Sequence, residues 1–428
     1  MPSRLYDIGA AALRAGAKLL GRVDAKAARR AAGAEAALDG LAPTPPHRDC
    51  YWMHCASVGE FEQGRPVWHR LMALAPEARF VLTFFSPSGV EWFAGRTDVG
   101  EVRYLPWDTR REAEALVGRL SPKLALFVKY EWWLNTHAVL RERGVPTVAF
   151  SVAFRQNQPF FRRWHPLHRG YRELLEGLTA VFVQSADSAA LLATHGYRQR
   201  ARVVGDTRLD RVLRLAAEDF ADARIEDWLG GRTRLLVAGS TWPKDEELLE
   251  GLLAARADYC LLCAPHEVDA ESRERLLSRF AAFAPVCYAA EADTQTDGTV
   301  TAPADSGRDS RVMILDAKGV LAKAYRYGRL AHVGGGFGAG VHNTLEPVAY
   351  RLPVAIGPRY RRFDEAMALA GTSVAVPCER VGDLVNFVAR FDDERELART
   401  RETAGAYLAE HGGATDAIVA YLTEQHLI

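Results

Sequence analysis

A glycine-rich segment in the second half of the chain has the residue types of an anion-binding loop. Five of the seven residues 334–340 are glycine, and they directly follow an apolar run. Glycines let backbone N–H groups approach an anion closely, and a helix that begins just after the loop adds a positive partial charge. The segment continues with the polar residues His342, Asn343, Thr344 and Glu346. It predicts a phosphate site in which Glu346 binds the paired hydroxyls of a ribose, although Glu346 also suits helix capping.

Two further polar pairs each follow an apolar run. Ser240 and Thr241 follow one run, and Pro265 and His266 follow the next. Taken alone, Ser240-Thr241 followed by acidic residues in the sequence is a pattern typical of helix N-caps. If both runs are strands of one parallel sheet, their carboxyl ends share an edge where ligands collect. We then expect the first pair to contact the phosphate and the second to contact the base or sugar.

Glu60 is the candidate general base. It ends the segment Ser57-Val-Gly-Glu60, which follows an apolar run and begins a probable helix. A carboxylate in a first helical turn remains ionised and can accept a proton from an attacking hydroxyl. The same position also suits a capping carboxylate.

Two mixed clusters of charged and aromatic residues follow later runs of the first half. One contains Lys129 and Glu131 beside two tryptophans, and the other contains Arg155 and Gln158 beside phenylalanines. Such clusters suit the binding of an acidic sugar or a glycolipid. The alternative for both is a domain surface or a membrane-facing patch.

The elements that must position these residues alternate along the chain. Short, nearly all-apolar runs separated by helix-length segments are typical of parallel sheets covered on both faces. The expected strands are 51–55, 80–85, 124–128, 147–150, 180–183, 235–238, 260–263, 312–315, 330–333 and 354–356.

Two series of such strands predict an α/β protein with two doubly wound, Rossmann-like domains that join near 211–232. The expected boundaries are 34–213 for the first domain and 214–428 for the second. Two placements of the last helix stay open: on the second domain, or packed back on the first. The polar segment 289–310 is expected to form a mobile loop inside the second domain.

Composition excludes some classes of function. Lys+Arg and Asp+Glu both number 54, so no overall field attracts nucleic acid. Cys260 and Cys263 stand three apart in an apolar run, where strand geometry turns them to opposite faces rather than toward one metal. The scattered cysteines fit a reducing cytoplasm.

The first 33 residues are predicted to form a separate amphipathic, membrane-associating segment. Seven basic residues against two acidic ones give it a net charge of +5, and Arg14, Lys18 and Arg22 recur every four residues. This pattern favours a helix lying on an anionic membrane surface. The alternative is an ordinary amphipathic helix packed on the domain.

The motifs together resemble those of the 3-deoxy-D-manno-octulosonic acid (Kdo) transferases. The resemblance runs from about Tyr51 to Gly371. It rests on elements in the family's order: Ser57-Val-Gly-Glu60, Lys129-Tyr-Glu-Trp-Trp133, Gln184, Gly205-Asp-Thr-Arg-Leu-Asp210, Ser240-Thr241, Asp316 with Gly319, and His342-Asn-Thr-Leu-Glu-Pro347.

The resemblance implies a GT-B fold, CMP-Kdo as donor, a lipid A precursor as acceptor, and inversion at the anomeric carbon. It further implies work at the cytoplasmic face of the bacterial inner membrane, with Glu60 as the general base. The implied donor-binding residues are Ser240, Thr241, Pro265, His266, Gly319, Gly335, Gly336, His342, Asn343, Thr344 and Glu346. The implied acceptor-binding residues are Ser57, Gly59, Lys129, Glu131, Arg155 and Gln158. No Asp-x-Asp pair follows a strand and CMP departs with one phosphate, so neither a metal nor another cofactor is expected.

The chain departs from the usual family pattern in two places. Lys129 stands where a carboxylate is usual, while Glu131 and Asn135 remain, and an arginine usual near Pro265-His266 is missing. These departures indicate a divergent branch. Two alternatives stay open: a GT-B transferase or epimerase that uses a UDP-sugar, and a non-catalytic scaffold that binds nucleotide or lipid.

Overall fold

The computed structural model describes residues 4–197, 200–289 and 309–428. The chain forms two compact units, which we call the first domain (Met1–Arg211 with His411–Ile428) and the second domain (Val212–Glu410). The N-terminal 33 residues are part of the first domain, and the chain returns to that domain for its last 18 residues. Most of the expected loop 289–310 lies outside the described residues.

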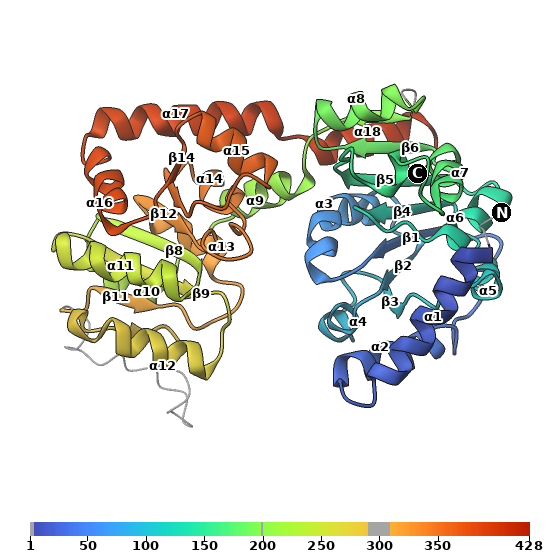
Figure 1. Cartoon of the computed structure of the whole chain (residues 1–428), viewed down its shortest axis with the longest axis horizontal. Helices are drawn as coiled ribbons and strands as arrows, with labels where there is room; N and C mark the ends of the chain where they lie inside the picture. Colours follow the sequence, from blue (N-terminus) through green and yellow to red (C-terminus); the bar gives the residue numbers. More distant parts are fainter. Residues whose placement is uncertain (1–3, 198–199, 290–308) are drawn as a thin grey trace. The chain divides into compact units, whose positions relative to one another are not determined.

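The first domain is built on a seven-stranded parallel sheet (Figure 1). Its strand order is β3-β2-β1-β4-β5-β6-β7, so the order reverses between β1 and β4. The strands are β1 (Cys50–Cys55), β2 (Arg79–Phe84), β3 (Glu101–Tyr104), β4 (Leu124–Val128), β5 (Thr147–Val152), β6 (Ala180–Val183) and β7 (Ala201–Val203).

Alternate residues of β1 face two separate cores, because successive side chains of a strand point to opposite faces. Tyr51 and Met53 pack in one core with residues of α3 and α18, whereas Trp52 packs in the other with residues of α5 and α6. Both faces are therefore apolar, as a parallel strand between helical layers requires. The helices after α2 are α3 (Val58–Leu74), α4 (Pro87–Phe93), α5 (Arg110–Leu120), α6 (Leu134–Glu142), α7 (His168–Gly177), α8 (Ala186–Thr194), α9 (Thr207–Ala217), which runs on into the second domain, and α18 (Ala414–Glu424).

The second domain repeats this plan with strand order β10-β11-β9-β8-β12-β13-β14. Within the described residues all of its strand pairs are parallel, and the order reverses between β8 and β12. The strands are β8 (Leu235–Thr241), β9 (Cys260–Pro265), β10 (Val286–Cys287), β11 (Val312–Ile314), β12 (Leu330–Val333), β13 (Val354–Ile356) and β14 (Ala375–Pro377).

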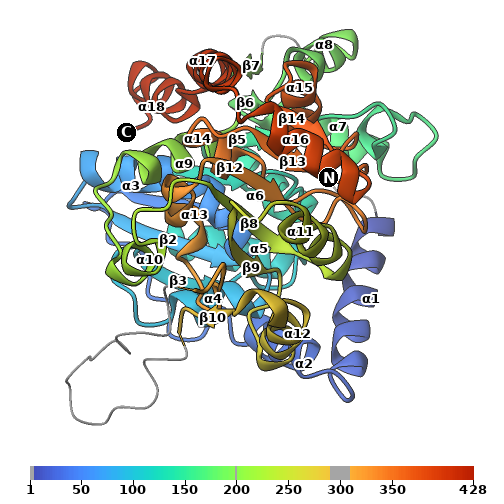
Figure 2. The same cartoon turned by 90° about the vertical axis from the view of Figure 1, so that its left-hand side faces the viewer.

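Helices cover both faces of the second sheet, with α11 and α13 on opposite sides of β8 (Figure 2). Leucines of α11 pack with β8, β9 and α16 in the main core of this domain. The helices are α10 (Ala223–Leu229), α11 (Pro243–Ala255), α12 (Ala270–Arg279), α13 (Leu321–Ala324), α14 (Leu345–Ala349), α15 (Asp364–Gly371), α16 (Val381–Arg390) and α17 (Glu394–His411).

The predicted fold class is confirmed, and all ten expected strands are present. The prediction missed β3, β7, β10 and β14. These four short strands include both edges of each sheet, and their residues are mostly only half-buried or exposed. An edge strand needs fewer apolar residues than a central one, so the apolar pattern does not reveal it.

The N-terminal segment forms two helices, α1 (Arg4–Leu20) and α2 (Ala25–Glu35). The predicted basic side of α1 faces α2, because Arg14 Nε donates to Glu35 at 2.7 Å and Lys18 Nζ lies 3.0 Å from the same carboxylate. The apolar side of α1 is exposed and includes Ile8 and Leu19, which are 65% and 64% exposed. Within the described residues, no helix is long and apolar enough to cross a membrane.

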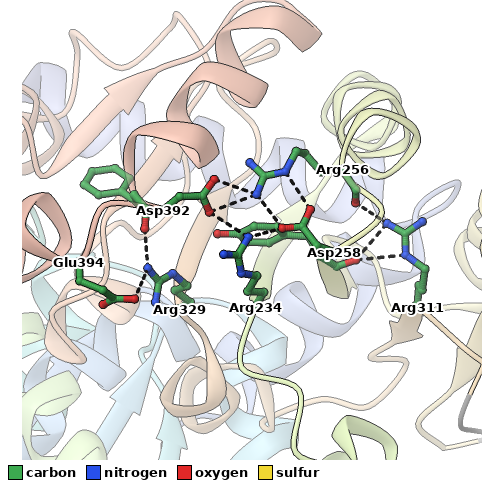
Figure 3. Close-up of polar contacts among 9 residues, drawn as sticks. Arg234, Arg256, Asp258, Arg311, Arg329, Asp392 and Glu394 are labelled. Carbon is green, nitrogen blue, oxygen red and sulfur yellow. Dashed lines mark hydrogen bonds and ion pairs between the residues drawn. The ribbon is translucent and has the colours of Figure 1, made fainter.

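A network of charged residues ties the amino ends of three central strands of the second sheet (Figure 3). Asp392, in the turn between α16 and α17, accepts from Arg256 and lies 3.2 Å from Arg234, the residue before β8. Asp258, just before β9, contacts the same two arginines, and Arg329, just before β12, donates to the carbonyl of Phe391. Shared charges of this kind fix strand ends, although each exposed pair alone contributes only roughly 0–1 kcal/mol. The opposite edge of the sheet carries the candidate site.

Candidate functional site

The predicted site residues gather at the points where strand order reverses. In the first domain most of them follow β1 and β4, and in the second domain most follow β8 and β12. The others belong to neighbouring strand ends: Arg155 and Gln158 follow β5, Pro265 and His266 stand at the end of β9, and Gly319 follows β11. Crossovers on either side of such a point leave in opposite directions, so a crevice opens beyond the carboxyl ends of the two strands. Each domain therefore presents one candidate half-site, which we describe separately.

Glu60 lies in the first turn of α3, beyond the end of β1. Its Oε2 accepts a hydrogen bond from the backbone N–H of Ala56 at 2.6 Å. Burial raises the pKa of Glu60 to about 7, and the charge of Glu131 acts in the same direction, against the Ala56 N–H and the charge of Lys129. A carboxyl group with a pKa near neutrality suits general base catalysis. Near neutral pH a substantial fraction of it is ionised, and the ionised form is basic enough to accept a proton.

Glu131 is held by a buried network that the sequence did not reveal. Its Oε2 accepts from Trp133 Nε1 at 2.8 Å and lies 2.9 Å from His54 Nε2. His54 is a fully buried residue of β1, and its Nδ1 lies 2.9 Å from Thr83 Oγ1 of β2. His137 Nε2 contacts the Glu131 carbonyl oxygen at 3.1 Å, and burial lowers the pKa of His137 to about 4. The network fixes the carboxylate of Glu131 beside Glu60.

The other expected acceptor residues occupy the same edge of the first sheet. Lys129 directly follows β4 in a left-handed conformation (φ 59°) and is close enough for its charge to affect Glu60. Ser57 is the N-cap residue of α3 but makes no capping side-chain bond, and Gly59 is exposed with space around it. In the loop after β5, the Gln158 side chain instead closes a turn by accepting from the backbone N–H of Arg155 at 3.1 Å.

Asp245 organises the half-site of the second domain. This fully buried residue of α11 contacts Nε2 of the equally buried His332 at 3.0 Å through Oδ1. Its Oδ2 accepts from the backbone N–H groups of Gly335 and Trp242, both at 3.0 Å. Burial alone would raise the pKa of Asp245, but His332 and these N–H groups hold it below its usual value. One carboxylate thus joins β12, the glycine loop and the start of α11.

The glycines at the start of the loop are required by close packing. A Cβ atom on Gly334 would lie 2.3 Å from the Ser240 carbonyl oxygen, and one on Gly336 would lie 2.6 Å from Gly357 Cα. Gly335 has φ 88°, a conformation that side chains other than glycine rarely adopt. The loop also uses many of its own N–H groups: those of Gly338 and Gly340 donate to the Gly335 carbonyl oxygen. The predicted anion-binding role therefore depends on fewer free N–H groups than the glycine count implies.

The Ser240–Thr241 turn contributes less side-chain chemistry than expected. Thr241 is 1% exposed, and its hydroxyl lies within 3.5 Å of Glu246 and of the Ala264 carbonyl oxygen. Ser240 has φ 53° and is more accessible, so its backbone and hydroxyl are the groups that this turn presents to a ligand.

Three aromatic rings stack beside this turn. The ring of His266, which follows Pro265 at the end of β9, lies 4.8 Å from the Trp242 ring and 4.3 Å from the His342 ring, with interplanar angles of 23° and 18°. Trp242 Nε1 donates to His342 Nε2 at 3.0 Å. Burial lowers the pKa of His342, and the neighbouring His266 acts in the same direction. The stack is a partly exposed platform at the carboxyl edge of the sheet.

The remaining predicted residues surround the start of α14. Asn343 Nδ2 donates to Glu346 Oε1 at 3.1 Å, and Asn343 Oδ1 accepts from the backbone N–H of Leu345. Thr344 is fully buried, and its hydroxyl has no hydrogen-bond partner within the described part of the chain. Gly319, in the loop after β11, has φ 84°. Glu346 is thus oriented by Asn343 beside the glycine loop.

Sequence reasoning missed the buried residues that hold the predicted site residues in position. His54 and His332 lie inside central strands, and Asp245 follows a helix start where acidic residues are common. A histidine in an otherwise apolar central strand was the available signal, since a buried imidazole needs a polar partner. Trp242 could also have been found from the sequence, because an aromatic residue directly after a strand end lies where ligands bind in a parallel sheet.

Sequence comparison relates the chain to one family of enzymes. Residues 26–211 match the family described as 3-deoxy-D-manno-octulosonic-acid transferase (kdotransferase). A transferase of that name from Bordetella pertussis is 25% identical over 374 residues, which cover 85% of this chain and 84% of the relative. One from Chlamydia trachomatis serovar A is 26% identical over 72% of this chain and 69% of the relative. A bifunctional glycosyltransferase/methyltransferase from Fusobacterium nucleatum is 22% identical, and the match spans 80% of this chain but only 53% of that longer protein.

Structural comparison confirms the predicted GT-B fold. UDP-GlcNAc 2-epimerase from Neisseria meningitidis superposes with a TM-score of 0.61 at 11% identity, covering 88% of this chain and all of the other. A glycosyltransferase from Rickettsia africae gives 0.57 at 10% identity, covering 88% and 98%. The chain is thus similar in sequence to Kdo transferases at 20–26% identity, and it has the two Rossmann-like domains of the GT-B fold.

Proposed function

We propose that the protein is an inverting glycosyltransferase that moves Kdo from CMP-Kdo to a sugar hydroxyl of a lipid A precursor. The observation that carries this proposal is Glu60, a carboxyl group with a pKa of about 7 at the carboxyl edge of the first sheet. A scaffold that only binds nucleotide or lipid gains nothing from a carboxyl group tuned in this way. The relatedness to Kdo transferases supports the choice of donor and transferred sugar.

In this proposal Glu60 takes the proton of the acceptor hydroxyl as its oxygen attacks the anomeric carbon of Kdo. The bond from that carbon to the phosphate oxygen breaks on the opposite face, and CMP leaves with the bonding electrons. Lys129 and Arg155 provide positive charge for an anionic acceptor, and Ser57 and Gly59 line the approach. Burial raises the pKa of Glu60, and the charge of Glu131 raises it further.

The second domain is assigned to the donor. The stacked rings of Trp242, His266 and His342 offer a flat face for the cytosine, since nucleobases stack on aromatic side chains. Glu346 accepts hydrogen bonds from the ribose, and the phosphate is bound between Ser240 and the glycine loop. Because Asp245 fixes the start of the glycine loop in advance, the loop can stabilise charge on a leaving phosphate without reorganisation.

The apolar side of α1 supports placement at a membrane surface, which we propose to be the cytoplasmic face of the bacterial inner membrane. Because Arg14 and Lys18 are paired with Glu35, we expect burial of Ile8 and Leu19 to contribute more than the charge of these two residues. Sedimentation with anionic vesicles tests this placement. The wild-type protein should sediment with the vesicles, and the double variant Ile8→Asp/Leu19→Asp should remain in the supernatant. Equal sedimentation of the wild type and the variant would refute the placement.

The first prediction concerns the base. With CMP-Kdo and a tetra-acylated lipid A precursor, the wild-type protein should add at least one Kdo unit, detected by mass spectrometry. Glu60→Gln should lower the rate by roughly 10²–10⁴-fold, the usual range for loss of a general base. Glu142→Gln, an exposed carboxylate change on α6, serves as the matched control. An undiminished rate for folded Glu60→Gln would exclude Glu60 as the base.

The second prediction concerns pH. Activity requires ionised Glu60, so kcat/KM should fall as the pH drops through about 7. Removing the neighbouring negative charge with Glu131→Gln should lower the pKa of Glu60 and move this acid limb to lower pH, by about one unit. Glu142→Gln should leave the limb in place. A shift toward higher pH would show that Glu131 does not destabilise the charge on Glu60.

The third prediction separates CMP-Kdo from a UDP-sugar, the donor type suggested by the epimerase-like fold. CMP should raise the melting temperature more than UMP does, because a ligand that binds only the folded state stabilises it. Trp242→Ala should weaken CMP binding by roughly tenfold or more through loss of stacking. Trp164→Ala, an exposed tryptophan of the first domain, should bind CMP normally. Stronger protection by UMP would favour the alternative donor.

A further inference from the structure

An apolar pocket of about 370 Å³ lies beside α1 in the first domain. Its lining combines one side of α1 with two tryptophans and the loop before α7, and includes Leu5, Ala10, Leu13, Trp107, Trp133 and Leu167. The volume falls within the roughly 300–1,000 Å³ typical of small-molecule sites. None of the predicted site residues lines it.

Polar contacts fix α1 along this pocket. The Tyr6 hydroxyl donates to Asp108 and accepts from the backbone N–H of Leu134 at 3.2 Å. Asn135 Nδ2 donates to Asp7 at 2.9 Å. These contacts join α1 to the start of α6 and to the loop that contains Asp108. They therefore hold the wall that α1 contributes to the pocket in place.

The pocket opens onto the exposed apolar side of α1. Leu5 and Leu13 both line it and are themselves 50% and 46% exposed. The lining residue His165 follows the exposed Arg162 and Arg163. An apolar interior beside two exposed positive charges complements an amphiphile with an anionic head.

The inner wall connects the pocket to the candidate base. Trp133 lines the pocket and donates to Glu131, whose charge raises the pKa of Glu60. A chain lying against Trp133 is therefore separated from the Glu131 carboxylate by one side chain.

We infer that this pocket binds one fatty-acyl chain of the glycolipid acceptor and thereby places the acceptor's sugar near Glu60. The inference rests on the proposed function. It adds a specificity device: the enzyme selects its acceptor through an acyl chain as well as through the sugar and its phosphates. Burying each methylene contributes to affinity, so a filled pocket should lower KM for acylated acceptors.

Ala10→Trp tests the inference, because Ala10 lines the pocket and an indole would occupy its space. Ala11→Trp is the matched control, since Ala11 is exposed on the same helix and does not line the pocket. The measured quantity is the ratio of kcat/KM for the acylated acceptor to kcat/KM for its fully deacylated form, both supplied in detergent-free solution below the aggregation concentration. Misfolding lowers both rates and leaves this ratio intact.

Ala10→Trp should reduce the ratio by roughly tenfold or more, mainly through KM of the acylated acceptor, as expected when several methylenes lose their burial. Ala11→Trp should keep the wild-type ratio. Equal ratios for all three proteins would overturn the inference and leave the proposed function standing.

A second readout is independent of turnover. The same glycolipid with a photoreactive group at the end of an acyl chain should label peptides of α1 and of the segment 165–167 in the wild type, and label them less in Ala10→Trp. Labelling there without any Kdo transfer would support the pocket and refute the proposed function. Labelling by a photoreactive phospholipid but not by the glycolipid would assign the pocket to the membrane and overturn the inference.

Discussion

Each domain depends on burying a hydrogen-bonded histidine–carboxylate pair at the point where its strand order reverses. Parallel strands lie between two helical layers, so their faces must be apolar and their polar groups need partners inside the fold. In the first domain His54 of β1 meets Glu131, which follows β4, at 2.9 Å. In the second, His332 of β12 meets Asp245, which follows β8, at 3.0 Å. Both pairs thus join the two strands that flank the reversal.

The two pairs have different chemical consequences. Asp245 accepts hydrogen bonds from two backbone N–H groups and also contacts His332. These contacts stabilise its charge and hold its pKa below the usual value. Its carboxylate fixes the start of the glycine loop through the N–H of Gly335. Glu131 stands beside a second carboxyl group, and its charge adds to burial in raising the pKa of Glu60 to about 7. A histidine–carboxylate pair therefore orders the glycine loop in one domain, and in the other it holds a carboxylate whose charge affects Glu60.

Each candidate carboxylate also has a hydrogen-bond partner that fixes its position. Glu60 accepts the N–H of Ala56, Glu131 is held by Trp133 and His54, and Glu346 accepts from Asn343. The candidate catalytic and ribose-binding carboxylates thus have their own positioning partners. At the opposite edge of the second sheet, the network of Asp258, Asp392 and their arginines fixes the amino ends of the strands.

The sequence by itself determined the fold class, the central strands and the places where functional residues follow them. Strands buried on both faces must be apolar throughout, so the amino-acid sequence alone shows where they are. The edge strands β3, β7, β10 and β14 are less buried and need fewer apolar residues, so the sequence pattern did not reveal them. Only the tertiary structure decided which side chains meet. It turned the Thr241 hydroxyl inward, used N–H groups of the glycine loop within the loop, and faced the basic side of α1 toward Glu35. It also brought His54 to Glu131 across 77 residues of sequence and His332 to Asp245 across 87. Such partnerships depend on strand order and register, which local sequence patterns do not encode.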